Sequence, residues 1–131
     1  ASLFALRPPI LVLDEPTTGL DWGRARDLLE RLRTMQEAGH TILFITHQMR
    51  LVADWADRVL VLDRGRLLAE GSPGAVFSRA EVMQKASLVP PPVTELSQRL
   101  SPYGMPDDCV SLEAFVASYA RLLARNQEEG S

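Results

Sequence analysis

The chain has 131 residues, 46% of them hydrophobic and 24% charged, which allows one domain or one domain with a short appendage. This composition excludes a disordered tail, a collagen-like rod and a coiled coil. The 14 basic and 17 acidic residues give a formal net charge of −3, which argues against nucleic-acid binding driven by phosphate neutralisation.

Cysteine content and hydropathy bear on the compartment. The single cysteine, Cys109, cannot form a disulfide within the chain, as is usual in a reducing compartment. No apolar run approaches the roughly 18 residues that a membrane-spanning helix needs. No basic segment followed by an apolar one marks a signal peptide at the N-terminus. The sequence therefore predicts a soluble intracellular chain.

The first elements are a truncated helix and a strand. Residues Ala1 to Leu6 have the pattern of the end of an apolar helix, which Arg7-Pro8-Pro9 terminates. Because neither a cap nor an initiator methionine precedes this helix, we interpret the chain as a fragment of a longer protein. The continuous apolar run from Ile10 to Leu13 predicts a strand buried on both faces.

Further helices and strands alternate after this strand. A helix is expected from Asp21 until just before Gly39, because its apolar residues share one face: Ala25, Leu28, Leu29, Leu32 and Met35. A second strand follows over 41–45, then a short helix whose common face holds Met49, Val52, Trp55 and Ala56. A third strand is expected over 58–62. This order predicts an α/β fold with a right-handed parallel sheet.

The C-terminal part changes in character. Asp63-Arg64-Gly65 predicts a hairpin turn with a return strand over 66–70. Two short helices are expected up to Ser87, and Pro90-Pro91-Pro92 predicts a rigid break or linker. Helices are then expected over 94–100 and 111–126, and Ser111 is the candidate N-cap of the second one.

Reactive side chains follow the first two strands. Asp14 and Glu15 end the first strand, and His47 follows the second. Ligands of open α/β sheets bind at the carboxyl ends of the strands. A carboxylate there can hold hydrated Mg²⁺ against the phosphates of a nucleotide, and a second one can polarise an attacking water. Taken alone, Asp14-Glu15-Pro16 could equally be a polar strand end.

A longer motif favours the nucleotide interpretation. The segment after the first strand reads Leu13-Asp14-Glu15-Pro16-Thr17-Thr18-Gly19-Leu20-Asp21, and it resembles the Walker B motif and D-loop of ATP-binding cassette (ABC) ATPases. Thr46-His47 resembles the switch histidine of the same family. The resemblance implies that Asp14 contacts Mg²⁺, usually through water, and that Glu15 is the general base or orients the water.

The other site residues also take their roles from this resemblance. His47 would hydrogen-bond the γ-phosphate of ATP, and Asp21 would lie across a subunit interface and couple two ATP sites. Without the family, a lone histidine after a strand, such as His47, is more often structural. We also interpret His40, in the loop before the second strand, as structural. The arginine-rich helix face over 24–33 is interleaved with acids, so we interpret it as solvated and not as a nucleic-acid patch.

The family's phosphate-binding parts are missing. A P-loop needs glycines that lead into Gly-Lys-Ser/Thr, whereas the only lysine, Lys85, follows Gln84. The Gly-rich signature and the glutamine loop are missing as well. The resemblance thus assigns residues 1–74 to the C-terminal half of an ABC ATPase domain, an incomplete P-loop NTPase parallel sheet with flanking helices. In that fold the P-loop strand lies between the strands at 41–45 and 58–62, which predicts unpaired edges on both.

Residues 75–131 are expected to form a helical C-terminal extension. The segment Val89-Pro90-Pro91-Pro92-Val93-Thr94-Glu95-Leu96 and the helices after it resemble the extension of energy-coupling-factor ATPases, which helps to hold two ATPase subunits together. By default, Trp22, Trp55 and the pair Phe115 and Tyr119 are interpreted as packing residues.

The resemblance implies an ATPase subunit of an importer for a metal ion or vitamin. ATP and Mg²⁺ would be bound, and the partners would be a second ATPase subunit and a transmembrane subunit, with no nucleic acid. The protein would lie at the cytoplasmic face of the membrane, and this piece alone would be inactive. Two alternatives stay open: a soluble ABC ATPase of translation or DNA repair, and a non-catalytic dimerisation fragment.

Overall fold

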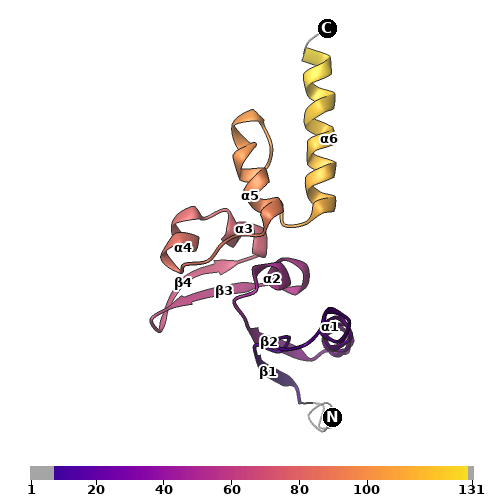
Figure 1. Cartoon of the computed structure of the whole chain (residues 1–131), viewed down its shortest axis with the longest axis vertical. Coiled ribbons are helices and arrows are strands. Elements are labelled where there is room, and N and C mark those ends of the chain that lie inside the picture. Colours follow the sequence, from indigo (N-terminus) through magenta and orange to yellow (C-terminus); the bar gives the residue numbers. More distant parts are fainter. Residues whose placement is uncertain (1–7, 130–131) are drawn as a thin grey trace. The chain divides into compact units, whose positions relative to one another are not determined.

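The computed structural model describes residues 8–129, so the helix predicted over residues 1–6 lies outside the described residues. The chain forms two compact units, one ending at His47 and the other beginning at Gln48. Figure 1 labels the helices and strands of both units. Each unit is a group of residues that contact one another, which is a different property from function. The functional boundary expected between residues 74 and 75 stays a prediction.

The first unit is a β–α–β motif. Strand β1 (Ile10–Asp14) is followed by helix α1 (Trp22–Glu37) and strand β2 (Thr41–Ile45). The two strands are parallel and in register, with Ile10 opposite Thr41 and Asp14 opposite Ile45. Both predicted strands and the helix between them are confirmed. Parallel neighbours need such a crossover helix, and the register brings the carboxyl ends of both strands to the same edge.

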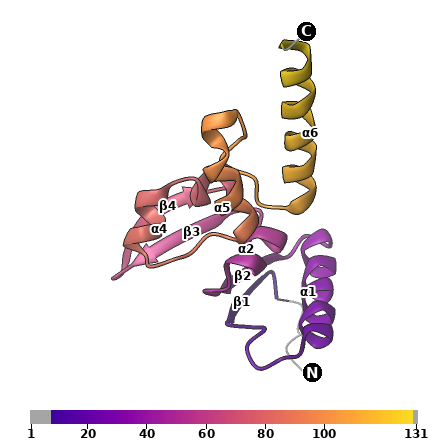
Figure 2. The ribbon, with the colours of Figure 1, turned by 45° about the horizontal axis from the view of Figure 1, so that its top comes forward.

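Helix α1 covers one face of this pair of strands (Figure 2). The helix buries Ala25, Leu29 and Leu32, and Leu11 of β1 is only 4% exposed. Side chains alternate between the two faces of a sheet along each strand. Val12 of β1 and Ile45 of β2 therefore lie on the face opposite to Leu11, and they are 56% and 55% exposed. One face of the β1–β2 sheet is thus packed, and the other presents apolar side chains to the solvent, so the prediction of a first strand buried on both faces is wrong.

The second unit begins with helix α2 (Met49–Trp55) and a β-hairpin of β3 (Val59–Asp63) and β4 (Arg66–Gly71). The strands are antiparallel. Arg64 and Gly65 between them have φ of 48° and 75°, which is the left-handed conformation that tight hairpin turns require. Among the described residues, β3 pairs only with β4 and β2 only with β1. The third strand therefore does not extend the parallel sheet within the described residues, and the P-loop strand expected between β2 and β3 stays a prediction.

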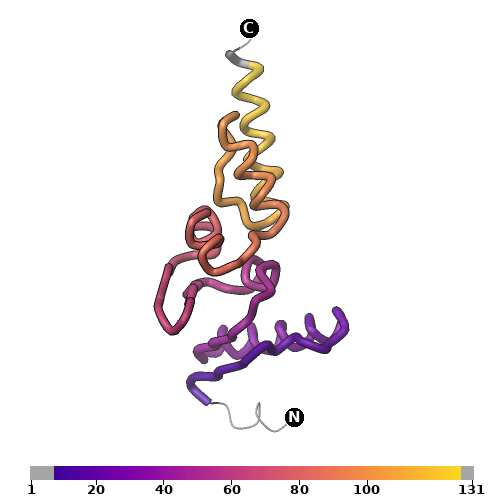
Figure 3. The backbone as a smooth tube through the Cα atoms, turned by 60° about the vertical axis from the view of Figure 1, so that its left-hand side comes forward, coloured from indigo at the N-terminus to yellow at the C-terminus, as the bar shows by residue number. Residues whose placement is uncertain are grey.

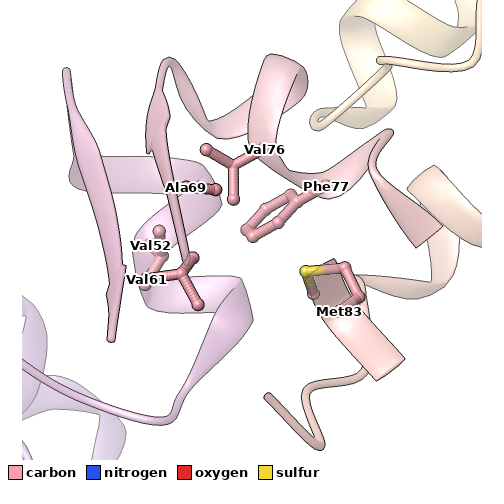
Figure 4. Packing of buried hydrophobic residues seen from close by; sticks show 6 residues of the cluster. All are labelled: Val52, Val61, Ala69, Val76, Phe77 and Met83. Atoms are coloured by element: carbon pink, nitrogen blue, oxygen red, sulfur yellow. The ribbon is translucent and has the colours of Figure 1, made fainter. Parts of the chain in front are cut away.

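The second unit has its own hydrophobic core, which Figure 4 shows from close by. Helices α3 (Pro73–Phe77) and α4 (Ala80–Lys85) share this core with the hairpin. Phe77 is 1% exposed and lies at the centre of a cluster of buried side chains from α2, the hairpin and both short helices. The cluster consists of Val52, Val61, Ala69, Val76, Phe77 and Met83.

The C-terminal helices are α5 (Pro92–Arg99) and α6 (Leu112–Glu129), with a 3-10 turn, η2, over Ser101–Tyr103. Figure 3 follows the backbone from α5 into α6. Ser111 caps α6 as predicted, because its hydroxyl accepts a hydrogen bond from the Ala114 amide at 3.1 Å. Cys109, in the loop between the two helices, is a buried free thiol, 5% exposed. None of the helices described within residues 8–129 is long and apolar enough to cross a membrane.

Candidate functional site

The site is built where β1 ends. The amide of Glu15 donates to the carbonyl oxygen of Ile45 at 2.8 Å, so backbone pairing with β2 continues one residue past Asp14. Glu15 then has φ of 44°, in the left-handed region. For a residue with a side chain this conformation costs roughly 1–2 kcal/mol. The chain leaves the sheet at this residue, and the Glu15 carboxylate contacts the end of β2.

Four donors hold the carboxylate of Glu15. Oε1 accepts from the His47 amide at 3.1 Å and lies 2.5 Å from Nδ1 of the His47 ring. Oε2 accepts from the Thr46 hydroxyl at 3.1 Å and from the Thr18 hydroxyl at 3.4 Å. The two residues predicted to carry the chemistry, Glu15 and His47, are therefore in direct contact although 32 positions separate them.

These contacts favour the ionised carboxylate. The hydrogen bond from the His47 ring, above all, holds the pKa of Glu15 below its ordinary value of 4.5, and the Thr46 hydroxyl and the His47 amide act in the same direction. Partial burial opposes them. A lowered pKa keeps Glu15 deprotonated at neutral pH, as a proton acceptor must be.

The His47 ring has two nitrogens with different surroundings. Nδ1 donates to Glu15, because a carboxylate oxygen can only accept. The side chain is 77% exposed, so Nε2 is available to a second partner. The contact with a γ-phosphate expected for His47 stays a prediction, and the contact that the structure describes is with Glu15.

Asp14 is the other carboxylate at this strand end. Its side chain is exposed, and no described residue forms a hydrogen bond or ion pair with it. Among residues 8–129, no group of three histidine, cysteine or acidic side chains could hold a metal ion alone. Mg²⁺ usually keeps several waters and binds through one or two carboxylates plus substrate phosphates. The Asp14 carboxylate, which has no hydrogen bond or ion pair with a described residue, fits that mode of binding.

Asp21 has a local structural contact. It is the N-cap of α1, and its Oδ1 accepts from the Arg24 amide at 2.9 Å while Oδ2 lies 3.4 Å from Nε of Arg24. Among the described residues, its hydrogen bonds and ion pairs do not reach Glu15 or His47. The role expected for Asp21 across a subunit interface stays a prediction.

Two other predictions concern packing residues. His40 is structural, as expected, because its Nδ1 donates to the carbonyl oxygen of Pro8 at 2.6 Å. The rings of Phe115 and Tyr119 stack with their centroids 6.1 Å apart. Sequence reasoning missed the threonine donors to Glu15. The available signal was that both lie inside the two quoted motifs, at positions 18 and 46.

The chain is similar in sequence to known proteins. The chain is 41% identical over 106 residues to the energy-coupling factor transporter ATP-binding protein EcfA2 of Streptococcus pyogenes serotype M5 (strain Manfredo), and the match covers 81% of this chain. EcfA2 of the serotype M3 strain SSI-1 matches to the same extent. In both cases the chain spans 38% of the relative's length. No family model matches the chain.

Solved structures show the same fold. CbiO1 from Clostridium perfringens, described as part of the ABC transporter complex cbiONQ, is 35% identical with a TM-score of 0.51 over 65% of this chain and 34% of that one. MJ1267, described as an ATP-binding cassette of an ABC transporter, is 28% identical with a TM-score of 0.53 over 63% of this chain and 34% of that one. The chain is therefore similar to part of the ATP-binding subunits of ABC transporters, including energy-coupling-factor proteins among them.

Proposed function

We propose that the chain is the C-terminal part of the ATP-hydrolysing subunit of an ABC importer of the energy-coupling-factor type. One observation carries the proposal: the Glu15 carboxylate at the end of β1 lies 2.5 Å from Nδ1 of His47 at the end of β2, a contact that lowers the pKa of Glu15. The similarity to EcfA2 and CbiO1 supports ATP as the substrate and a transporter as the assembly.

In the proposed reaction Glu15 activates a water molecule. The water oxygen bonds to the γ-phosphorus of ATP, the bond from phosphorus to the ADP oxygen breaks, and one proton of the water passes to Glu15. His47 would donate from Nε2–H to the phosphate, as the Nε2 tautomer or as the imidazolium, while its amide still donates to Glu15. Asp14 would hold Mg²⁺ through water, and the ion would offset the negative charge of the phosphates.

The chain alone would not complete this reaction. It lacks the backbone cradle and the lysine that fix the phosphates, so we propose that isolated residues 1–131 neither bind ATP tightly nor hydrolyse it. The missing parts would come from the rest of the subunit and from a second ATPase subunit. Asp21 would couple the two ATP sites across that interface.

The helical extension, residues 75–131, would help to hold the two ATPase subunits together. Helix α6 supports this role because apolar side chains line its outer face at spacings of four, three and four residues. They are Leu112, Val116, Tyr119 and Leu123, which are 66%, 55%, 42% and 46% exposed. Such spacing forms one stripe along a helix and is typical of a face that packs against another helix.

The membrane partner and cargo complete the proposal. We propose that the subunit binds a transmembrane transporter subunit at the cytoplasmic face of the membrane, binds no nucleic acid, and powers uptake of a metal ion or vitamin. EcfA2 is named for an energy-coupling factor transporter, and CbiO1 is described as part of a transporter complex.

The test replaces the proposed base in the full-length subunit assembled with its partners. Glu15→Gln keeps the size of the side chain and removes its charge, so turnover should fall by about 10²- to 10⁴-fold while ATP still binds. Asp14→Asn should weaken both Mg-ATP binding and turnover. His47→Ala should lower turnover without weakening binding of Mg²⁺. Phosphate release and ATP-binding calorimetry measure these effects.

A matched control is Glu37→Gln at the C-terminal end of α1, an exposed position in the same unit. This change removes the same charge away from the site and should leave turnover as it is in the parent. If Glu15→Gln hydrolysed ATP at close to the parent rate, Glu15 would not be the base.

A further inference from the structure

We infer that Thr46 is a positioning residue for Glu15, which holds Oε2 of the carboxylate so that Oε1 faces the reacting water. This inference rests on the proposed function. It assigns a role to a hydroxyl that lies beside the predicted site residues, directly after the last residue of β2.

The donors to Glu15 are divided between its two oxygens. Both donors to Oε1 belong to His47, namely the ring and the backbone amide, at 2.5 and 3.1 Å. Both donors to Oε2 are threonine hydroxyls, from Thr46 at 3.1 Å and Thr18 at 3.4 Å. Each oxygen of the carboxylate is therefore held by different residues.

This division has a consequence when ATP occupies the site. If the His47 ring turns toward a phosphate, Oε1 loses its shortest contact and gains a free lone pair that can accept a proton. The hydroxyl of Thr46 still fixes Oε2, so the carboxylate keeps its orientation at that moment. A base must be oriented before the reaction, because a small misplacement lowers the rate steeply.

Thr46 is better suited to this role than Thr18. Its contact with Oε2 is 0.3 Å shorter than that of Thr18 (3.1 against 3.4 Å), and its side chain is partly buried whereas that of Thr18 is exposed. The Thr46 backbone also follows a strand paired along its whole length with β1, so its position relative to Glu15 is fixed. Thr18 lies in the loop between β1 and α1.

The experiment compares threonine substitutions in the full-length subunit assembled with its partners. Thr46→Val removes the hydroxyl but keeps the branched shape, and kcat should fall by about 10-fold because a hydrogen bond to a charged group is lost. The KM for ATP and the affinity for ATP should stay within about 2-fold, since the proposed role of Thr46 is to orient Glu15 and not to contact ATP. Thr46→Ser should restore most of kcat. Thr18→Val should cost less than Thr46→Val.

Thr41→Val is the matched control. It makes the same chemical change at the other end of β2, on an exposed side chain, and should leave kcat unchanged. Single-turnover hydrolysis by Glu15→Gln with and without Thr46→Val completes the set. Residues that act as one unit are non-additive, so Thr46→Val should cause less than about 2-fold further loss in that background.

The outcomes separate the two levels of the proposal. A parent-like kcat in Thr46→Val, a loss confined to KM, or a full 10-fold further loss in the Glu15→Gln background would overturn the positioning role of Thr46. Failure of Thr46→Ser to recover activity would also overturn it. A parent-like rate in Glu15→Gln alone would overturn the proposed function, and the role of Thr46 with it.

Discussion

Among the described glycines, Gly74 lies nearest to the backbone of another segment, and it offers a test of the second unit. A Cβ atom at Gly74 would lie 2.6 Å from the carbonyl oxygen of Asp108, about 0.8 Å short of the 3.4 Å at which ordinary contact begins. Asp108 belongs to the loop that leads into α6. Replacement by alanine must therefore push α3 and this loop apart.

Two opposing effects decide the result of Gly74→Ala. Alanine favours a helix over glycine by up to about 1 kcal/mol, whereas forcing an extra carbon into a packed contact costs about 1–3 kcal/mol. The Asp108 carbonyl is part of the backbone, which cannot rotate away as a side chain can, so we expect a net destabilisation of about 1–2 kcal/mol.

Hydrogen–deuterium exchange on the full-length protein measures this effect. The amide of Ser78 donates to the Gly74 carbonyl oxygen at 3.0 Å, and its exchange should become about 5- to 30-fold faster. Gly23→Ala is the matched control, because Gly23 is also the second residue of its helix but a Cβ there would meet only a side-chain atom, Oδ1 of Asp21, at 3.3 Å. Exchange in α1 should not accelerate. Unchanged protection of Ser78 in Gly74→Ala would refute the close approach.

Two further substitutions test the core and a helix cap. Phe77→Ala removes a ring that is 1% exposed and should destabilise the second unit by about 3–5 kcal/mol in urea denaturation, whereas Leu67→Ala, at 52% exposure, should cost far less. Similar losses for both would contradict the core assignment. Ser111→Ala should lower the stability of α6 by about 1 kcal/mol, measured by exchange of its first amides, and Ser111→Asp should not.

The first unit was predictable because local signals agree with its packing. Helix α1 begins after Asp21, whose carboxylate caps it, and Gly39 follows its end with φ of 95°, a conformation that favours glycine. The apolar runs of β1 and β2 match the observed strands to within one residue. An apolar run and a cap depend only on neighbours in the sequence, so they can be recognised without knowing the fold.

Strand pairing and the proline segment were less accessible. The run in β3 is equally suited to parallel and antiparallel neighbours, and only the turn at Arg64 and Gly65 indicates that its partner is β4. The proline triplet predicted a break, with a helix starting at Thr94. The helix instead starts at Pro92, because proline lacks the amide that the first helical residue leaves unpaired.

The contacts of Glu15 lay beyond sequence reasoning. A left-handed backbone at a glutamate has no signal in its own residue type, since glycine and asparagine usually adopt it. The hydroxyls of Thr18 and Thr46 reach the carboxylate only because of that backbone angle and of the register between β1 and β2. The residues of the candidate site were predicted from the sequence, but their mutual hydrogen bonds required three-dimensional geometry.

The buried thiol of Cys109 makes the C-terminal loop measurable by chemistry. It is the chain's single cysteine, 5% exposed, with Sγ 3.9 Å from the carbonyl oxygen of Pro106. A maleimide or a disulfide reagent can react with it only after the loop opens, because the thiolate must first meet the reagent. The rate of alkylation of this chain therefore counts opening events of the segment before α6, and the free energy of opening follows from its ratio to the rate for an unfolded peptide.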